Sequence, residues 1–464
     1  ATGMNISVGR ISLSFPLNLV VTDVDAASPH KDTLLSVRRL QVNVQLLPLL
    51  KKQVEVDGIS LQGATVNSND LIHGMRLNGT LGELFISSHG VALDPETAIV
   101  NKVLLKDTDL SLCLNDTAAA DTAASDPTYW KIILQDIDLQ NVSFALDMPL
   151  DSLSLAASLD NATLRDGLID LHKSAYSLQT FRIKNGRVRY DSGRPSATAS
   201  ADSLSAGLDP SHIALTDIGV KLDSLYYEGR NMKAVISQFV LKERSGVEIV
   251  STEGRLVSND KVLRVPSLKL ETRDSYLELN AAMDWDALDF KKEGLVSARL
   301  MADIGKPDVV RFMGSMDEKF IRKYPSEPLR IRTGIDGDLN KLKLTTLTAE
   351  LPGALELFAK GELTSLTDSL LRGGDITLQA ETKDLKFIST LAEGIEIPYG
   401  TRLEGKFTMA GPKMGTDLLL MQPEAHAVAA ADTIPITVYN DSISVADDFK
   451  MERAARLFAK YDLS

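Results

Sequence analysis

The residues best suited to chemistry are aspartates that recur in pairs two positions apart along the chain. The two members of such a pair lie on one face of a β-strand, where their carboxylates can bind a cation. The sharpest case is the segment DGDLN beginning at Asp336, which starts like a calcium loop. A calcium loop needs glycine at its sixth position and glutamate at its twelfth, where this chain has Lys341 and Leu347. We therefore interpret the pairs as solvated strand faces.

Other residues that could take part in catalysis do not have the spacing that known catalytic motifs require. The six histidines are scattered, and no two of them are placed four residues apart as on the helix of a metalloprotease. The sequence has no glycine-rich phosphate loop and no nucleophile elbow. Its single cysteine, Cys113, excludes an internal disulfide and a cysteine-based metal site, and we interpret it as a small buried hydrophobe. The sequence thus predicts a non-enzymatic protein without cofactor or metal.

Composition narrows the class of protein further. The chain has 464 residues and a formal net charge of −13, and its basic residues are thinly spread, which argues against nucleic acid and against a direct anionic membrane partner. Apolar residues make up 44% and aromatic residues only 5%, as suits long sheets. No apolar run reaches the ~18 residues of a membrane-spanning helix. We expect an anchor or export signal upstream, in a larger protein.

Alternation with a period of two dominates the chain and predicts many strands, each with one apolar and one polar face. The run from Leu40 to Leu46 is typical, with apolar residues at every second position. Each run is short and ends at Gly, Asn, Asp or Pro. The predicted fold class is all-β: a long curved antiparallel sheet that forms a U-shaped apolar groove with a few short helices.

A weak repeat supports an extended, repetitive body. Its unit is a strand, a polar corner and a second strand, and the next apolar residue follows five positions after the first strand. Copies begin at Ile59, Val103, Ile137 and Phe181. The expected turn residues at the corners are Gly63, Asp107, Asn141 and Asn185-Gly186.

Helical patterns are few. We predict helices near 307–324 and 384–393, another within 447–461 and a single turn at 46–52. The predicted organisation is an N-terminal module (1–114), a flexible loop (115–128), a continuing repetitive groove (129–411) and a C-terminal segment ending in a helix (412–464). The loop lacks any apolar anchor and interrupts no domain, because the strand pattern resumes after it.

Two stretches resemble the AsmA/TamB-like superfamily, and most of all its TamB-like branch in Bacteroidetes. The first contains Gly9-Arg10-Ile11, the phrase DTLLSV from Asp32, the turn LPLL from Leu47 and a strand closing at Val66. The second is GIEIPYG from Gly394, followed by Leu403-x-Gly405. Between them the likeness lies in the succession of strands with Gly and Asn corners, and after about Gly411 it ends.

The resemblance implies a U-shaped trough with an apolar floor, anchored in the inner membrane of a Gram-negative bacterium and extending across the periplasm. It implies transport of phospholipid between the inner and outer membranes, with acyl chains as the bound group. For TamB-like members it also implies assembly of outer-membrane proteins with a BamA/TamA-like barrel partner.

Three functions stay open at this point: a lipid conduit, a scaffold that binds client strands at a sheet edge or in the trough, and a compact β-sandwich that interacts with other proteins. Alternation alone does not distinguish a dry core from a lipid-filled trough. The candidate groove residues are Val42, Val44, Val54, Val56, Ile59, Leu61, Leu110, Leu112, Ile137, Leu139, Phe181, Ile183, Leu268, Leu270, Leu342 and Leu344.

Overall fold

The computed structural model describes most of the chain. The described residues are 5–15, 18–28, 33–44, 56–68, 74–92, 96–115, 129–193, 207–289, 292, 294–313, 318–338, 340–366, 368, 370–390, 399–411, 413–422 and 453–462. They form an all-β protein with few helices, which confirms the predicted fold class at that level. The chain divides into two compact units, Ala1–Val257 and Ser258–Ser464, at a boundary for which the sequence held no signal.

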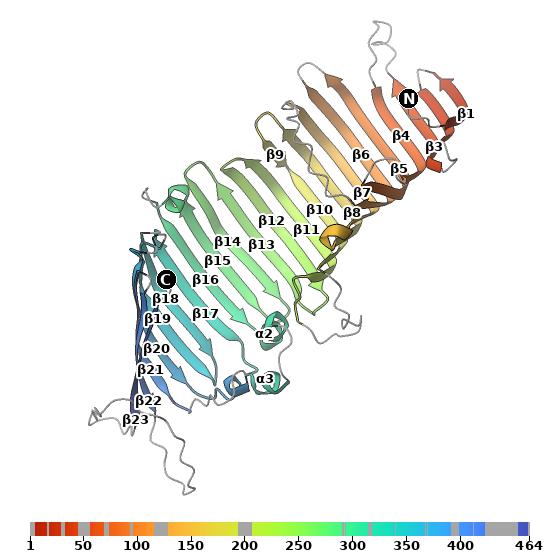
Figure 1. Cartoon of the computed structure of the whole chain (residues 1–464). Coiled ribbons are helices and arrows are strands. Elements are labelled where there is room, and N and C mark those ends of the chain that lie inside the picture. The colour runs from red at the N-terminus through yellow and green to blue at the C-terminus, as the bar shows by residue number, and fades with distance from the viewer. Residues whose placement is uncertain are drawn as a thin grey trace. The chain divides into compact units, whose positions relative to one another are not determined.

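The first unit is a sheet of long strands that neighbour one another in space (Figure 1). They are β1 (Asn5–Ser14), β2 (Asn18–Ala27), β3 (Thr33–Val44), β4 (Val56–Asn67), β5 (Met75–Ala92), β6 (Thr97–Leu114), β7 (Lys131–Met148), β8 (Leu153–Asp170), β9 (Ala175–Leu178), β10 (Thr180–Ser192), β11 (His212–Glu228), β12 (Asn231–Glu243) and β13 (Glu248–Ser258). From β1 to β6, each strand pairs antiparallel with the next strand in the sequence.

One pair of strands departs from this rule. β6 and β7 are parallel, with Val103 opposite Ile137 and Leu110 opposite Phe144. A parallel pair needs a connection that returns along the sheet. That connection is the predicted loop 115–128, which lies outside the described residues except for Asn115. The sheet then continues through β8 to β10, so the strands before and after the loop belong to one body.

The second unit is also an antiparallel sheet. Its strands are β14 (Val262–Thr272), β15 (Tyr276–Asp284), β16 (Val296–Ile304), β17 (Leu329–Gly337), β18 (Lys341–Leu351), β19 (Leu355–Thr364), β20 (Gly373–Thr382), β21 (Arg402–Ala410), β22 (Lys413–Gln422) and β23 (Arg453–Asp462). Each strand pairs with the next from β14 to β23. In Figure 1 β14 to β17 are seen face-on and β19 to β22 edge-on, so this sheet curls.

The helices are shorter than the sequence predicted. The predicted helix at 307–324 is found as two, α2 (Lys306–Met313) and α3 (Glu318–Lys323). The helix predicted at 384–393 is wrong for the residues described there, which form only the 3-10 turn η3 (Ile388–Thr390). Two further 3-10 turns are η1 (Pro149–Asp151) and η2 (Trp285–Leu288). The turn predicted at 46–52 lies outside the described residues.

The predicted C-terminal helix is also wrong. Residues 453–462 form β23, which pairs antiparallel with β22 along its whole length. The apolar residues of this segment have helical spacing, but pairing with the backbone of β22 stabilises a strand instead, because tertiary context outweighs local propensity. None of the helices within the described ranges is long and apolar enough to cross a membrane.

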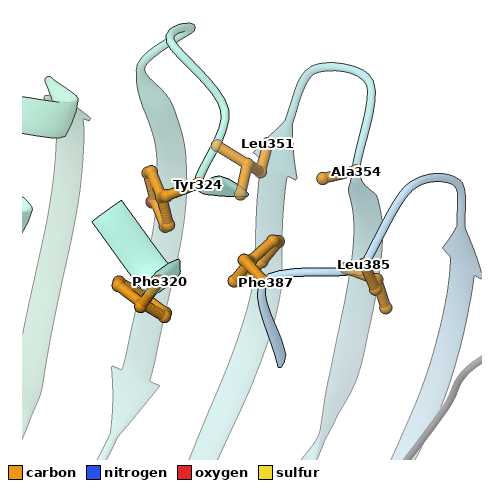
Figure 2. Packing of buried hydrophobic residues seen from close by; sticks show 6 residues of the cluster. All are labelled: Phe320, Tyr324, Leu351, Ala354, Leu385 and Phe387. Carbon is orange, nitrogen blue, oxygen red and sulfur yellow. The ribbon is translucent and has the colours of Figure 1, made fainter. Parts of the chain in front are cut away.

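The best-buried apolar cluster lies in the second unit at one end of the strands. Figure 2 shows Phe320, Tyr324 and Phe387 close together over the hairpin end of β18, and the three rings contact one another at centroid distances of 5.1 to 5.7 Å. Leu351 at the end of β18, Ala354 in the turn that follows it and Leu385 complete this cluster. The aromatic residues of the helical segment therefore anchor it to the sheet end.

A buried carboxylate holds α2 in place. Asp308 is fully buried and accepts hydrogen bonds from Ser275 Oγ at 2.6 Å and Arg311 Nη1 at 2.9 Å, and one from Thr272 Oγ1. Arg311 also pairs with Asp274 at 2.8 Å. Burial by itself raises the pKa of Asp308, but the hydrogen bonds from Ser275, Thr272 and Arg311 outweigh it and hold that pKa below its ordinary value of 3.8.

We predict that Asp308→Asn lowers the free energy of unfolding by about 2–3 kcal/mol, because buried hydrogen bonds to a charged group are lost. Since the folded-state pKa of Asp308 is depressed, its contribution is present above pH 3.8 and lost as pH falls through the folded value. Urea titrations at neutral and acid pH measure both effects. Asp274→Asn is the milder control because its side chain is 26% exposed. Equal losses in the two variants at neutral pH would contradict this account.

Candidate functional site: an uncovered apolar sheet face

The predicted corners of the repeat are not chain reversals. Gly63, Asp107, Asn141 and Asn185 each lie inside one continuous strand and have left-handed backbone angles, with φ between 50° and 61°. Asp23 in β2 is a fifth such residue, with φ 54°. Gly, Asn and Asp are the residues that adopt this conformation at the lowest cost. The strands are correspondingly long, up to 18 residues in β5 to β8, which corrects the expectation of short strands.

These residues are aligned across the first unit. In each strand the residues on either side of this position pair with the neighbouring strand, but the residue itself has no pairing partner. The unpaired residues of neighbouring strands lie opposite each other, so they follow one line across the strands. We call this line the crease. Its members, from β1 to β8 and then β10, are Gly9, Asp23, Arg38, Gly63, Gly82, Asp107, Asn141, Asp160 and Asn185.

The crease alternates in backbone conformation. In every antiparallel pair a left-handed residue is opposite one that is not left-handed, as Asp107 is opposite Gly82. The approach is close: a Cβ at Gly82 would lie 2.8 Å from Cβ of Asp107, and one at Gly9 would lie 2.9 Å from Cβ of Asp23. Glycine is therefore required at these two positions because a side chain would collide with the neighbouring strand.

Polar side chains connect neighbouring strands along the crease. Asn141 Nδ2 donates to Asp107 Oδ1 at 2.9 Å, and Asn185 Nδ2 donates to Asp160 Oδ2 at 2.9 Å. Arg187 adds an ion pair to Asp160 at 3.6 Å. These contacts join neighbouring strands at the crease.

The crease explains the five-residue spacing of the repeat. A left-handed residue shifts the alternation of a strand by one position, as a bulge does. In β6 the apolar positions are Val103 and Leu105 before Asp107, then Leu110 and Leu112 after it. Because every strand shifts at the crease, apolar side chains continue on one face of the sheet on both sides of it.

Cross-strand pairing joins these side chains into rows perpendicular to the strands. On one side of the crease the Leu61 row consists of Val21, Leu40, Leu61, Leu84, Leu105, Leu139, Ala162, Ile183, Val220 and Phe239. Next to it the Ile59 row consists of Leu19, Val42, Ile59, Ile86, Val103, Ile137, Leu164, Phe181, Leu222 and Ile236.

A further row runs on the other side of the crease. The Leu112 row consists of Leu77, Leu112, Leu146, Leu155, Tyr190 and Ile213. Between it and the crease, Leu110 is opposite Gly79 in β5 and Phe144 in β7. The apolar face is therefore one surface that the crease crosses.

No second layer buries the rows among the described residues. In the Leu61 row only Ala162 is buried, and the other members are half-buried. Ile59 and Phe144 remain 37% and 38% exposed. The core of a β-sandwich would bury such side chains between two sheets. The half-buried rows instead form a contiguous apolar surface of the kind that binds an apolar partner.

The second unit carries a similar face without a left-handed crease. Leu270 is opposite Leu277, and the row continues through Ala302, Ile331, Ala349, Leu357, Ala380, Leu403 and Leu420. Irregular register between Val265 and Leu268, and between Leu344 and Leu347, produces the same one-residue shift in β14 and β18. The four predicted residues here, Leu268, Leu270, Leu342 and Leu344, share this face.

The structure places the other predicted groove residues as follows. Leu61, Leu139 and Ile183 fall in the Leu61 row, and Leu110 and Leu112 fall beyond the crease. Val42, Ile59, Ile137 and Phe181 fall in the Ile59 row, and Val44 lies two residues beyond Val42 in β3. Val54 lies outside the described residues; Val56 is opposite Val44, and its side chain is likewise outside them.

Two of the aspartate pairs have members with structural roles. Asp338 Oδ1 accepts hydrogen bonds from the backbone N–H of Asn340 at 2.8 Å and of Lys341 at 2.7 Å, which closes the hairpin between β17 and β18. Asp136 and Asp138 both pair with Arg165 in β8. Across the residues with described placement, no group of three or more His, Cys, Asp or Glu residues could hold a metal ion.

Sequence reasoning missed Leu40, Leu84 and Leu105 as members of the face. The signal for them was present, because each lies two residues from another apolar position.

Comparisons with protein-family models, with curated proteins and with solved structures find no match to this chain.

Proposed function

We propose that this protein binds phospholipid acyl chains on its apolar face and carries them between membranes, as a non-enzymatic protein of the Gram-negative envelope. In this proposal the chain belongs to a longer AsmA/TamB-like protein, which is anchored in the inner membrane by a segment outside these residues. The trough extends across the periplasm toward the outer membrane. The phospholipid headgroup stays in water at the rim.

The observation that supports the proposal best is the continuity of the rows. The Leu61 row crosses every strand from β2 to β8 and then β10 to β12 with apolar side chains, and all of these except Ala162 are only half-buried. An acyl chain of about 16 carbons loses roughly 12 kcal/mol of favourable burial when it crosses water, at ~0.8 kcal/mol per methylene. A continuous row removes that barrier because the chain stays in apolar contact as it moves.

Native mass spectrometry of the purified chain tests the proposal. We expect bound phospholipid that survives mild desolvation, together with phospholipid recovered by organic extraction of the same sample. Extraction of an unrelated soluble protein from the same cells is the control for carry-over. A chain that is folded by circular dichroism but has no lipid above this control would contradict the proposal.

A second candidate function is a scaffold for outer-membrane protein assembly beside a BamA/TamA-like barrel. It is favoured by β1, whose ten residues are all exposed and whose described pairing is with β2 alone. An exposed strand edge of this kind adds strands from other chains. The two functions are separable, because a scaffold needs no bound lipid.

A further inference from the structure

We infer that the edge of β1 away from β2, which pairs with no strand among the described residues, binds an antiparallel strand of a partner polypeptide, and that the crease dictates the pattern of that strand. This inference deepens the scaffold function and is independent of lipid binding. It starts from the edge itself. Ile6, Ile11 and Leu13 are 66% to 69% exposed, and Phe15 just beyond the strand is 89% exposed.

β1 lacks the usual protection of an edge strand. Natural edges are blunted by lysines, prolines or a bulge that twists the strand away. The sequence NISVGRISLS of β1 has one charged residue, Arg10, and no proline. It is instead built like an interior strand, because Gly9 continues the crease and the apolar side chains switch from Ile6 and Val8 to Ile11 and Leu13 across it.

The positions of apolar residues around the crease residue follow two patterns, which alternate between antiparallel neighbouring strands. In the first, the residues on the apolar face lie two positions before and one position after the crease residue, as Leu61 and Ala64 flank Gly63. In the second, they lie one before and two after, as Leu81 and Leu84 flank Gly82. The first pattern has the left-handed residue at its centre, and the second does not.

Each antiparallel pair from β1 to β6, and the pairs of β8 with β7 and β10, join one pattern with the other. The parallel pair β6 and β7 joins two strands of the first pattern. The reason is that antiparallel strands run in opposite directions. Apolar residues of the two strands are therefore opposite each other only if one strand has the first pattern and the other has the second. Val8 and Ile11 flank Gly9 in the second pattern, so an antiparallel partner must have the first.

The partner strand therefore has Gly, Asn or Asp at its centre, with apolar residues two before and one after. The same rule disfavours a second copy of β1 as the antiparallel partner, since two strands of the second pattern would place Val8 opposite Arg10 when the two glycines are aligned. A strand of the first pattern would extend the apolar face by one more strand at β1 (Figure 1).

Peptide binding to the full chain tests the inference. The probe is a labelled peptide with the sequence of β4, VDGISLQGATVN, which has the first pattern. One control is the same peptide without its central glycine, and a second is the β1 sequence. We expect the probe to bind by fluorescence anisotropy and to crosslink within residues 5–14. Both controls should bind at least about tenfold more weakly.

Two further measurements separate strand addition from adhesion of an apolar peptide. Two further probes carry backbone N-methyl groups, one at every odd position and the other at every even position. One of them should bind about tenfold more weakly and the other should bind unchanged, because only alternate backbone N–H groups of the probe point toward β1. On the protein, Ile11→Lys with Leu13→Lys should weaken binding, and Ser12→Lys with Ser14→Lys should not. Equal binding of the β1 peptide, equal effects of the two methylated sets, or crosslinks outside 5–14 would overturn the inference, whatever the lipid content of the chain.

Discussion

Replacing Leu61 and Leu139 with glutamate is expected to remove most of the phospholipid from the purified chain. The two residues flank Leu84 and Leu105 in the Leu61 row, so the carboxylates would interrupt its centre. Burying an ionised group against an acyl chain is strongly unfavourable, and a loss of only 1.4 kcal/mol lowers the binding affinity about tenfold. Quantitative lipid extraction of the variant against the unchanged chain measures the effect.

The chain offers a matched control. Gln62 and Gln140 are the next residues along the same two strands and point to the opposite face. Gln62→Glu with Gln140→Glu adds the same charge without touching the apolar face, and its lipid content should stay unchanged. If both double variants lose lipid equally, charge alone is responsible and the row is not the binding surface.

Asn141→Val is expected to lower the free energy of unfolding by about 2–3 kcal/mol. The left-handed backbone at this position disfavours a β-branched residue by roughly 1–2 kcal/mol, and the hydrogen bond to Asp107 contributes about 1 kcal/mol more. The valine would also favour ordinary alternation and so place the apolar residues of β7 beyond the crease on the wrong face. Chemical denaturation of the variant measures the loss.

Asn141→Gly is the control for this effect. Glycine adopts the left-handed conformation freely, so this variant loses only the hydrogen bond to Asp107, at about 1 kcal/mol. The difference between valine and glycine isolates the backbone requirement. Equal stability of the two variants would show that the crease does not depend on a left-handed residue at position 141.

The alternation of apolar residues was enough to predict the fold class, because the sheet has one apolar face and a period of two follows directly from it. It also predicts that residues such as Leu61 and Ile137 share one face of their strands, as the pairing of the first unit has them. These predictions depend only on neighbours along the chain. They therefore hold wherever a strand is regular.

The crease could not be predicted, because the same residue types mark a turn and a left-handed position inside a strand. Asn141 and Asp107 fit either interpretation locally. Which one applies is decided by the neighbouring strand, whose pairing has a gap at the same place and which provides a hydrogen-bonding partner. The five-residue spacing from Leu61 to Val66 and from Leu105 to Leu110 was the available signal, since a chain reversal does not require an odd spacing.

The errors near the C-terminus have the same origin. Residues 453–462 have helical spacing, but β22 offers them a complete ladder. The segment after Asp384 also has helical spacing, but Leu385 and Phe387 are drawn into the aromatic cluster at the sheet end (Figure 2). Both outcomes depend on residues distant in the sequence.

Photocrosslinking with a phospholipid that carries a diazirine in its acyl chain tests the central claim most directly. After irradiation and proteolysis, mass spectrometry identifies the labelled residues. We predict that labels concentrate on the apolar face, along the Leu61 and Ile59 rows, and spare the opposite face at positions such as Gln62 and Gln140. Labels spread equally over both faces, or no labelling above that of a denatured sample, would contradict the lipid-binding face.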